Sequence, residues 1–458
     1  MANLTTDAKL CIQREIDVQI IGNDDTKIKT KYRIAETCMW LNTNKYTKVC
    51  LQFPDELLGI SSKIYEELKR GTEADLYILG DTSYASCCVD IVASMHVQSD
   101  AIVHYGHTCF SKANIPVYIV LNEKPLNVDY IMKILKENLK DYIPEKLCLF
   151  YDCEFEHIKD TLTKKWFKQY PKSYMASIAP EENSNKFLGR LVKNIKNGEF
   201  SSDILQDCVC IYIGSRGRTF FNLTVSVAAD KWYLLDPISN QLDIIEDTVW
   251  FKRRRFLIEK CKDANVVGIL VCQLAGDQTK DIISRMKQLC KANGKKSYIV
   301  SVGKPNVAKL ANFPEIDVYV MIACPENDLY DSRDFYQPIV YPYELEVALN
   351  SNRPAYFTTH VTDYDELLPG KKHYKDISDI CDDTDVSLIT GKIRETKVTT
   401  TSTSTDLVEK QNWELENIGQ NLNKKSWKGL EQKLGENVVK QVEKGRKGVP
   451  IQYLNEAE

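Results

Sequence analysis

The stretch GDTSYASCCVDIVASMHVQSDAIVHYGHTC, residues 80–109, places three cysteines just after two apolar strand-like runs. Cys87 and Cys88 are adjacent and follow the run ADLYILGD, and Cys109 follows the run DAIVHYG. In parallel α/β sheets, ligands bind beyond the carboxyl ends of the strands. The pattern therefore predicts that these thiols lie at the functional edge of one α/β sheet.

The rest of the chain repeats this organisation. Short apolar runs alternate with helix-like segments, which is typical of parallel α/β architecture. Three successive sets of four such runs indicate a threefold internal repeat. The predicted fold class is α/β, with three homologous small parallel-sheet domains in a pseudo-threefold triangle around a central site. The expected divisions are a polar lead-in at 1–30, repeats at 31–130, 131–240 and 241–394, and a flexible linker with a C-terminal tail at 395–458.

Two segments between the strands show helical spacing of apolar residues. The first is DELLGISSKIYEELKRG, residues 55–71, and the second is TKDIISRMKQLCKANG, residues 279–294. Each ends on a glycine, which often terminates a helix. We therefore expect helices that stop at Gly71 and Gly294.

The composition limits the class of protein. The formal charge is only −4, so no global field favours nucleic acid or an anionic membrane. No long apolar run predicts a membrane span, and the polar N-terminus does not resemble a secretion signal. The expected location is the cytoplasm, where the 15 cysteines would not form a disulfide framework. Several are expected to be small core residues because they sit inside apolar runs: Cys50, Cys148, Cys208, Cys210 and Cys272.

Cys324 occupies a position in the third repeat that corresponds to Cys109 in the first. Each follows the third strand of its repeat. Three converging thiolates suit an iron–sulfur cluster with one open iron. Zinc is the competing metal, although structural zinc sites usually contain CxxC pairs, which this sequence lacks. An equally favoured interpretation is that these cysteines are buried core residues that bind no metal. Since successive side chains of an extended chain point to opposite faces, only one of Cys87 and Cys88 is expected to be a ligand.

For other polar side chains, a structural role is favoured over a functional one. His104 or His107 could line the site and move protons near pH 7. We favour His104 as the buried end of a strand, bonded to a backbone carbonyl. The segment FKRRRF could present Arg253–Arg255 to an acidic partner, but an exposed helix face beside buried Phe251 and Phe256 is favoured.

Three long stretches around these residues closely resemble the diphthamide biosynthesis family, in particular its eukaryotic subunit-two branch. They are ILGDTSYASCCVDIVASMHVQSDAIVHYGHTCFS, KKSYIVSVGKPNVAKLANFPEIDVYVMIACPEN and FYQPIVYPYELEVALN. The resemblance covers residues 30–395 and implies three α/β domains with a cluster-binding edge facing the centre.

The resemblance also implies an activity and a cofactor. The family catalyses the first step of diphthamide synthesis, in which a 3-amino-3-carboxypropyl radical from S-adenosylmethionine is added to a histidine of translation elongation factor 2. A 4Fe-4S cluster supplies the electron. The subunit-two pattern puts the cluster ligands at Cys88, Cys109 and Cys324, whereas the first-domain ligand of the archaeal homodimer and the catalytic paralogue aligns better with Cys87.

One departure from the family pattern indicates a particular role. The archaeal homodimer and the catalytic paralogue take one cysteine from each domain, but no counterpart of their second-domain ligand is found here. The resemblance therefore implies an accessory subunit that supports reduction of the cluster in a paralogous catalytic subunit. Its further partners would be the elongation factor, as substrate, and an electron-donor protein.

Two other functions remain open. Quinolinate synthase also arranges three α/β repeats around a cluster, so a stand-alone iron–sulfur lyase is the alternative. It would need a ligand from every domain, which argues against it. The other possibility is a purely structural partner with unmetallated cysteines.

Overall fold

The computed structural model describes most of the chain between residues 25 and 394. The described ranges are 25–80, 87–140, 142, 146–179, 186–196, 198–245, 248–272, 279–303, 305–326, 335–354, 357–377, 385–391, 393–394, 448–449 and 452–453. The chain forms two compact units, residues 1–398 and 399–458. In the second unit, β18 (Gly448–Val449) pairs antiparallel with β19 (Gln452–Tyr453). Almost all of the expected linker and tail lies outside the described residues.

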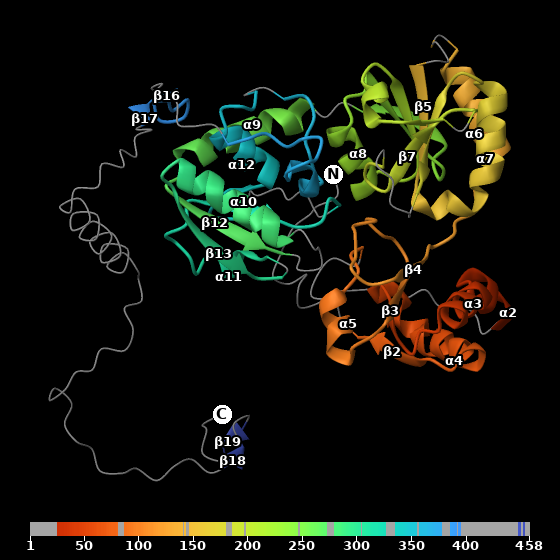
Figure 1. Cartoon of the computed structure of the whole chain (residues 1–458). Coiled ribbons are helices and arrows are strands. Elements are labelled where there is room, and N and C mark those ends of the chain that lie inside the picture. Colours follow the sequence, from red (N-terminus) through yellow and green to blue (C-terminus); the bar gives the residue numbers. More distant parts are fainter. Residues whose placement is uncertain are drawn as a thin grey trace. The chain divides into compact units, whose positions relative to one another are not determined.

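The first unit contains three main sheets (Figure 1), and the first and third are wholly parallel. The first sheet has the order β2-β1-β3-β4, with β1 (Lys48–Gln52), β2 (Asp75–Leu79), β3 (Ala101–Tyr105) and β4 (Val117–Val120). The third has the order β13-β12-β14-β15, with β12 (Val266–Val271), β13 (Lys296–Ser301), β14 (Val318–Ile322) and β15 (Ile339–Val340).

The second sheet is larger and mixed, with the order β11-β10-β9-β5-β6-β7-β8. Its parallel part consists of β5 (Leu147–Tyr151), β6 (Tyr174–Ile178), β9 (Val209–Ile213) and β10 (Lys231–Asp236). The antiparallel additions were not predicted from the sequence: β7 (Arg190–Lys193), β8 (Glu199–Phe200) and β11 (Gln241–Ile245). They lie outside the four parallel strands, and β8 and β11 are too short or too polar to form an apolar run. Through β11, the sheet extends beyond the boundary expected at residue 240.

The three sheets share one strand order. Counting only the parallel strands, each runs second, first, third, fourth, as β2-β1-β3-β4, β6-β5-β9-β10 and β13-β12-β14-β15. All twelve of these strands coincide with the predicted apolar runs. The α/β class with three parallel-sheet repeats is therefore confirmed. In such sheets the strands end at one common edge, which is where the cysteines were expected.

Most of the described helices of the first unit lie between successive strands, whereas α2 and α3 precede β1. They are α2 (Asp25–Lys31), α3 (Ile34–Asn44), η1 (Asp55–Ile60), α4 (Ser61–Gly71), α5 (Ile91–Val97), α6 (Val128–Asn138), η3 (Cys153–Ile158), α7 (Lys159–Gln169), η4 (Ser202–Leu205), α8 (Arg218–Ser226), α9 (Thr248–Asp263), α10 (Thr279–Ala292), α11 (Val307–Leu310), α12 (Pro342–Leu349) and η6 (Tyr364–Leu367). Within the described part of the chain, none is both long and apolar enough to cross a bilayer.

Both helices predicted in the sequence are present, with one difference. Residues 55–60 form a 3₁₀ turn before α4, so that the predicted first helix has two parts. Gly71 is the last residue of α4. Gly294 follows α10 with φ of 64°, the left-handed conformation that ends many helices. The expected lead-in at 1–30 includes the start of α2, whose Ile28 is buried in the first core.

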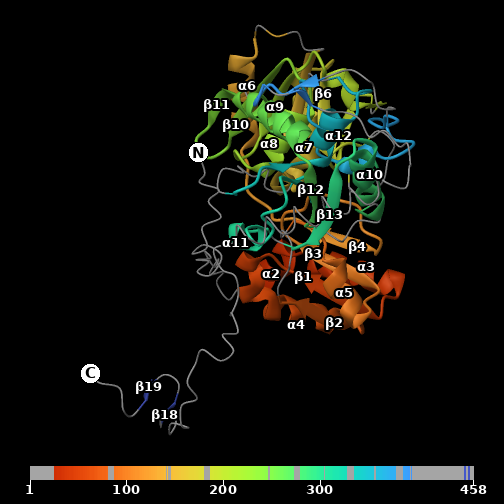
Figure 2. The same cartoon turned by 90° about the vertical axis from the view of Figure 1, so that its left-hand side faces the viewer.

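Helices α9, α10 and α12 share one core with the third sheet (Figure 2). Buried ion pairs join the same helices. Arg254 of α9 is 3% exposed and pairs with Glu344 of α12, which has no exposed surface. Burial alone would raise the pKa of Glu344, but Arg254 and His360 outweigh it and lower the pKa to about 2. The prediction of an exposed arginine face was therefore wrong for Arg254, and Phe256 is 49% exposed rather than buried.

The stability of the fold is expected to depend on pH through the carboxyl of Asp363. This carboxyl caps η6 by accepting a hydrogen bond from the Asp365 amide at 3.2 Å. Burial and the Asp365 charge raise its pKa to about 7. An unfolded aspartate ionises near pH 4, so the folded state loses stability as the pH rises from about 4 to about 7. Asp363→Asn keeps the capping oxygen without the charge.

We expect Asp363→Asn to leave the free energy of unfolding unchanged at about pH 4 and to increase it by about 1–2 kcal/mol at about pH 8. The whole pKa shift of Asp363 between the unfolded and folded states would correspond to about 4 kcal/mol of stability. Because the residue is partly exposed, we expect a smaller effect. Urea unfolding at the two pH values measures the effect. Asp230→Asn, at an exposed position, is the control. An equal change at both pH values would contradict the assignment.

Candidate metal centre

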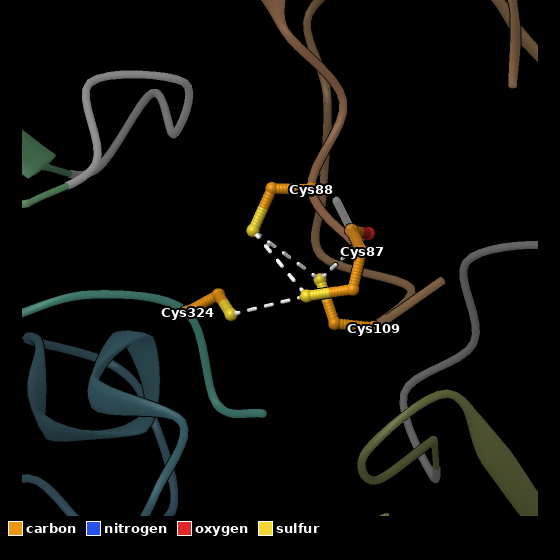
Figure 3. Close-up of side chains that lie close together, drawn as sticks. All are labelled: Cys87, Cys88, Cys109 and Cys324. Atoms are coloured by element: carbon orange, nitrogen blue, oxygen red, sulfur yellow. Dashed lines mark hydrogen bonds between the residues drawn. The ribbon is translucent and has the colours of Figure 1, made fainter. Parts of the chain in front are cut away.

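Four cysteine sulfurs from two repeats converge at one point (Figure 3). The Sγ atoms of Cys87 and Cys88 are 3.9 Å apart, those of Cys88 and Cys109 are 3.8 Å apart, and those of Cys87 and Cys324 are 3.8 Å apart. All four lie within 4.8 Å of one another, and all four residues are buried. The structure thus brings the predicted ligands Cys88, Cys109 and Cys324 together and adds Cys87 to them.

The end of β1 positions the adjacent pair. Gln52, the last residue of this strand, is buried and uses both ends of its amide. Its Nε2 donates to the Cys88 carbonyl at 2.7 Å, and its Oε1 accepts from the Asp90 amide at 2.9 Å. The Asp90 side chain in turn caps α5 by accepting from the Ala93 amide. The first strand of the repeat therefore anchors the segment that follows the second strand.

The turn around Cys87 and Cys88 also corrects one expectation. Both thiols point into the same cluster, although adjacent side chains were expected to point apart. That expectation assumed an extended backbone, whereas these two residues lie in a turn and a bend. The alternation of side chains applies only to extended chain.

Cys109 is held by contacts within the first repeat. The buried His104, in β3, contacts the His107 carbonyl through Nε2 at 3.0 Å, which confirms the structural role expected for His104. Between them, Gly106 has φ of 94°, a conformation that favours glycine. The Cys109 amide then donates to the Cys87 carbonyl at 3.2 Å. These bonds direct the residues after β3 back toward the adjacent cysteines.

Cys324 is the contribution of the third repeat. It lies two residues beyond β14, a central and fully buried strand. Its own exposure is only 3%, and its sulfur faces Cys87 across 237 positions of sequence. Packing of the first repeat against the third therefore closes the cluster.

The close approach of the thiols shifts pKa values within the cluster in opposite directions. Hydrogen bonds from the Cys324, Cys87 and Cys88 thiols lower the pKa of Cys109 well below its usual value. The pKa of Cys324 is raised well above it, chiefly because its proton is held by Cys109. Thiols this close together share their protons, and thiolate is the form that binds metals.

A second group of polar side chains lies beside the cysteines and joins all three repeats. His107 contacts the Cys153 sulfur at 3.1 Å through Nδ1 and the Glu326 carboxylate at 2.5 Å through Nε2. Thr219 also reaches His107 Nε2, at 3.4 Å. Burial lowers the pKa of His107, but its bonds to Cys153 and Glu326 outweigh this and raise it to about 12.

Sequence reasoning considered His107 but missed its partners. Cys153 follows β5, as part of YDCEF, and therefore occupies a strand end of the second repeat. The position of Cys153 at a strand end was the sequence feature that could have identified it as a candidate site residue. Glu326 follows Cys324 by two residues, and nothing in its local sequence distinguishes this buried glutamate from exposed acidic residues. Its position opposite His107 depends on packing between the repeats.

The fold and the site together define a class. The chain is a three-repeat α/β protein that gathers only sulfur donors at one buried point, and this is the donor set that soft metals such as zinc, or iron in iron–sulfur clusters, prefer.

Comparisons with other proteins define the family. A profile of the diphthamide synthesis protein family matches residues 53–357. The chain is 35% identical over 461 residues to 2-(3-amino-3-carboxypropyl)histidine synthase subunit 2 of Danio rerio, covering 93% of this chain and 91% of that protein. It is 34% identical to the protein of the same name from Xenopus laevis, covering 99% of each. The chain belongs to the diphthamide synthesis family.

A solved structure agrees with the fold. Dph2 from Pyrococcus horikoshii, in a crystal structure with a 4Fe-4S cluster, superimposes with a TM-score of 0.55 at 20% identity. The match covers 71% of this chain and 92% of that one. At this level of identity, the likeness supports the shared architecture.

Proposed function

We propose that this chain is an accessory iron–sulfur subunit of the enzyme for the first step of diphthamide biosynthesis. In that step, the 3-amino-3-carboxypropyl group of S-adenosylmethionine is transferred to a histidine of translation elongation factor 2. The observation that carries the proposal is the convergence of four buried thiols, Cys87, Cys88, Cys109 and Cys324, in a chain of this family. The name shared by its relatives in Danio rerio and Xenopus laevis supports the reaction. The expected compartment is the cytoplasm.

The donor atoms are of the type that holds the proposed cluster, and the sulfurs would have to move apart to accommodate it. Cys88, Cys109 and Cys324 are the proposed ligands, and Cys87 places a fourth sulfur within reach of the same metal site. A 4Fe-4S cluster is held by cysteine thiolates, and when bound it supplies one-electron redox chemistry. The residues of this chain bury that site and supply its four thiols from the first and third repeats.

One observation makes zinc an alternative metal for the cysteine cluster. The sulfur–sulfur separations of 3.8–3.9 Å are close to the roughly 3.8 Å expected between thiolates around one tetrahedral zinc ion. Iron and zinc analysis of the same sample therefore belongs to the test of function.

The accessory role is supported by what the second repeat contributes. Its four described cysteines are Cys148, Cys153, Cys208 and Cys210. Three of them lie in one hydrophobic core, and Cys153 contacts His107 and Asp152. Among the described residues, the cysteine cluster therefore draws on the first and third repeats only. This departs from a family pattern with one ligand in each domain, and we propose that the chain relays electrons to a catalytic paralogue from an electron-donor protein.

The test uses the full chain purified without oxygen, alone and mixed with its catalytic paralogue. We expect a brown protein with about four irons per chain. Cleavage of S-adenosylmethionine and modification of elongation factor 2 should require the mixture. Full turnover by this chain alone would contradict the accessory role and favour a stand-alone lyase. A colourless protein with zinc, or with no metal, would overturn the iron–sulfur assignment.

A further inference from the structure

A second group of metal-ligating atoms lies outside the cysteine cluster. It consists of His107 Nδ1, a carboxylate oxygen of Asp152 and Cys153 Sγ, which all lie within 4.8 Å of one another. The Cys153 sulfur is 3.1 Å from His107 Nδ1 and 3.2 Å from Asp152 Oδ1. His107 comes from the loop after β3 and the other two from the end of β5, so two repeats build the group.

The outer atoms of this group are held by other residues. Glu326 contacts His107 Nε2 at 2.5 Å, and the Tyr212 hydroxyl donates to Asp152 Oδ2 at 2.8 Å. These contacts leave His107 Nδ1 and Asp152 Oδ1 facing the Cys153 sulfur. Metal-binding histidines usually donate their second ring nitrogen to a carboxylate, and metal-binding carboxylates are themselves hydrogen-bonded. The arrangement around the three inner atoms is therefore that of a metal site with supporting partners.

We propose that His107, Asp152 and Cys153 bind one zinc ion. Nitrogen, sulfur and oxygen donors of this kind suit zinc, whereas magnesium and calcium prefer oxygen alone. Typical zinc–ligand bond lengths place neighbouring donors about 3.4–3.6 Å apart, so the observed separations need only a small expansion. Zinc displaces two protons: that on His107 Nδ1, while Nε2 keeps its proton toward Glu326, and the thiol proton of Cys153, which ends its hydrogen bond to Asp152. A neutral imidazole, a thiolate and a carboxylate remain as ligands. Three protein ligands leave the fourth position for water or another ligand.

Another reading of the same atoms is a nucleophilic thiol with a histidine base and a supporting carboxylate. Burial argues against it. Cys153 is only 3% exposed, and burial raises its pKa to about 11 despite the nearby His107. A nucleophile must reach its substrate, whereas a structural metal ligand needs no such access.

The proposed ion has a structural consequence. It joins the first repeat to the second directly, and it reaches the third through Glu326. It lies beside the cysteine cluster, because His107 precedes Cys109 by two residues, but its mixed donors differ from the sulfur-only set there. This inference does not depend on the proposed function, since the two sites share no ligand.

The test measures zinc and iron in the full chain after anaerobic purification and dialysis against a mild chelator. We expect about one zinc per chain in the unmodified protein. Cys153→Ala and His107→Gln should lower zinc affinity at least about tenfold while the iron content stays the same. Cys208→Ala removes another buried cysteine of the second repeat and should retain the zinc.

Cobalt provides an independent readout. Cobalt(II) loaded into the site should give a sulfur-to-cobalt charge-transfer band and tetrahedral d–d bands, both of which Cys153→Ala removes. If the variants fail to fold, the intensity of the charge-transfer band on the unmodified chain separates the two sites, because one thiolate ligand gives a much weaker band than three or four. The proposal is wrong if the unmodified chain takes up neither ion. It is also wrong if Cys88→Ala, rather than Cys153→Ala, removes the zinc, because the ion would then occupy the cysteine cluster.

Discussion

Cys324→Ala is expected to lower the iron content of the anaerobically purified chain at least about tenfold. Cys324 is the single cysteine that the described part of the third repeat contributes to the cluster, and its sulfur lies 3.8 Å from that of Cys87. Without it, the remaining sulfurs all come from the first repeat. The loss should appear as reduced iron and sulfide per chain and a weaker visible charge-transfer band.

The matched control for this variant is Cys272→Ala. Cys272 also follows a strand of the third repeat, β12, and is 8% exposed, but it lies in a hydrophobic core. The Cys272→Ala variant should therefore bind as much iron as the unmodified chain. Among the adjacent cysteines, Cys88→Ala should lose iron and Cys87→Ala should lose less. Retention of iron by Cys324→Ala would show that the cluster binds elsewhere.

Glu346→Ala is expected to lower the free energy of unfolding by about 3–5 kcal/mol. The Glu346 carboxylate has no exposed surface and pairs with two buried arginines, Arg285 at 2.7 Å and Arg353 at 2.8 Å. Removing it leaves two guanidinium groups without their shared anion, and an uncompensated buried charge is strongly unfavourable. Chemical unfolding of the metal-free chain measures the change.

The control for this variant is Glu66→Ala, which removes an exposed glutamate from α4 and should change the stability by less than about 0.5 kcal/mol. A loss below about 1 kcal/mol for Glu346→Ala would indicate that both arginines find other partners. The effect should be confined to stability, because Glu346 lies in the helix-side core of the third repeat and contacts none of the four cysteines.

The sequence by itself determined the repeated architecture. Each parallel strand lies in a mainly apolar run, and the buried strands β3, β5, β9 and β14 have no exposed residue. Burial on both faces requires such runs, so the pattern is visible locally. The positions of Cys88, Cys109 and Cys324 after strands followed from the same reading, as did the structural role of His104.

Only the tertiary structure decided which side chains meet. The turn at Cys87 and Cys88 directs both sulfurs inward, and Cys153 faces His107 rather than the cysteine cluster. The buried pairing of Arg254 with Glu344 was equally hidden in a run of charged residues. Strands and helices follow from hydrophobic periodicity over a few residues, whereas these contacts join positions up to 237 residues apart. They depend on how the repeats pack against one another, which no local sequence pattern indicates.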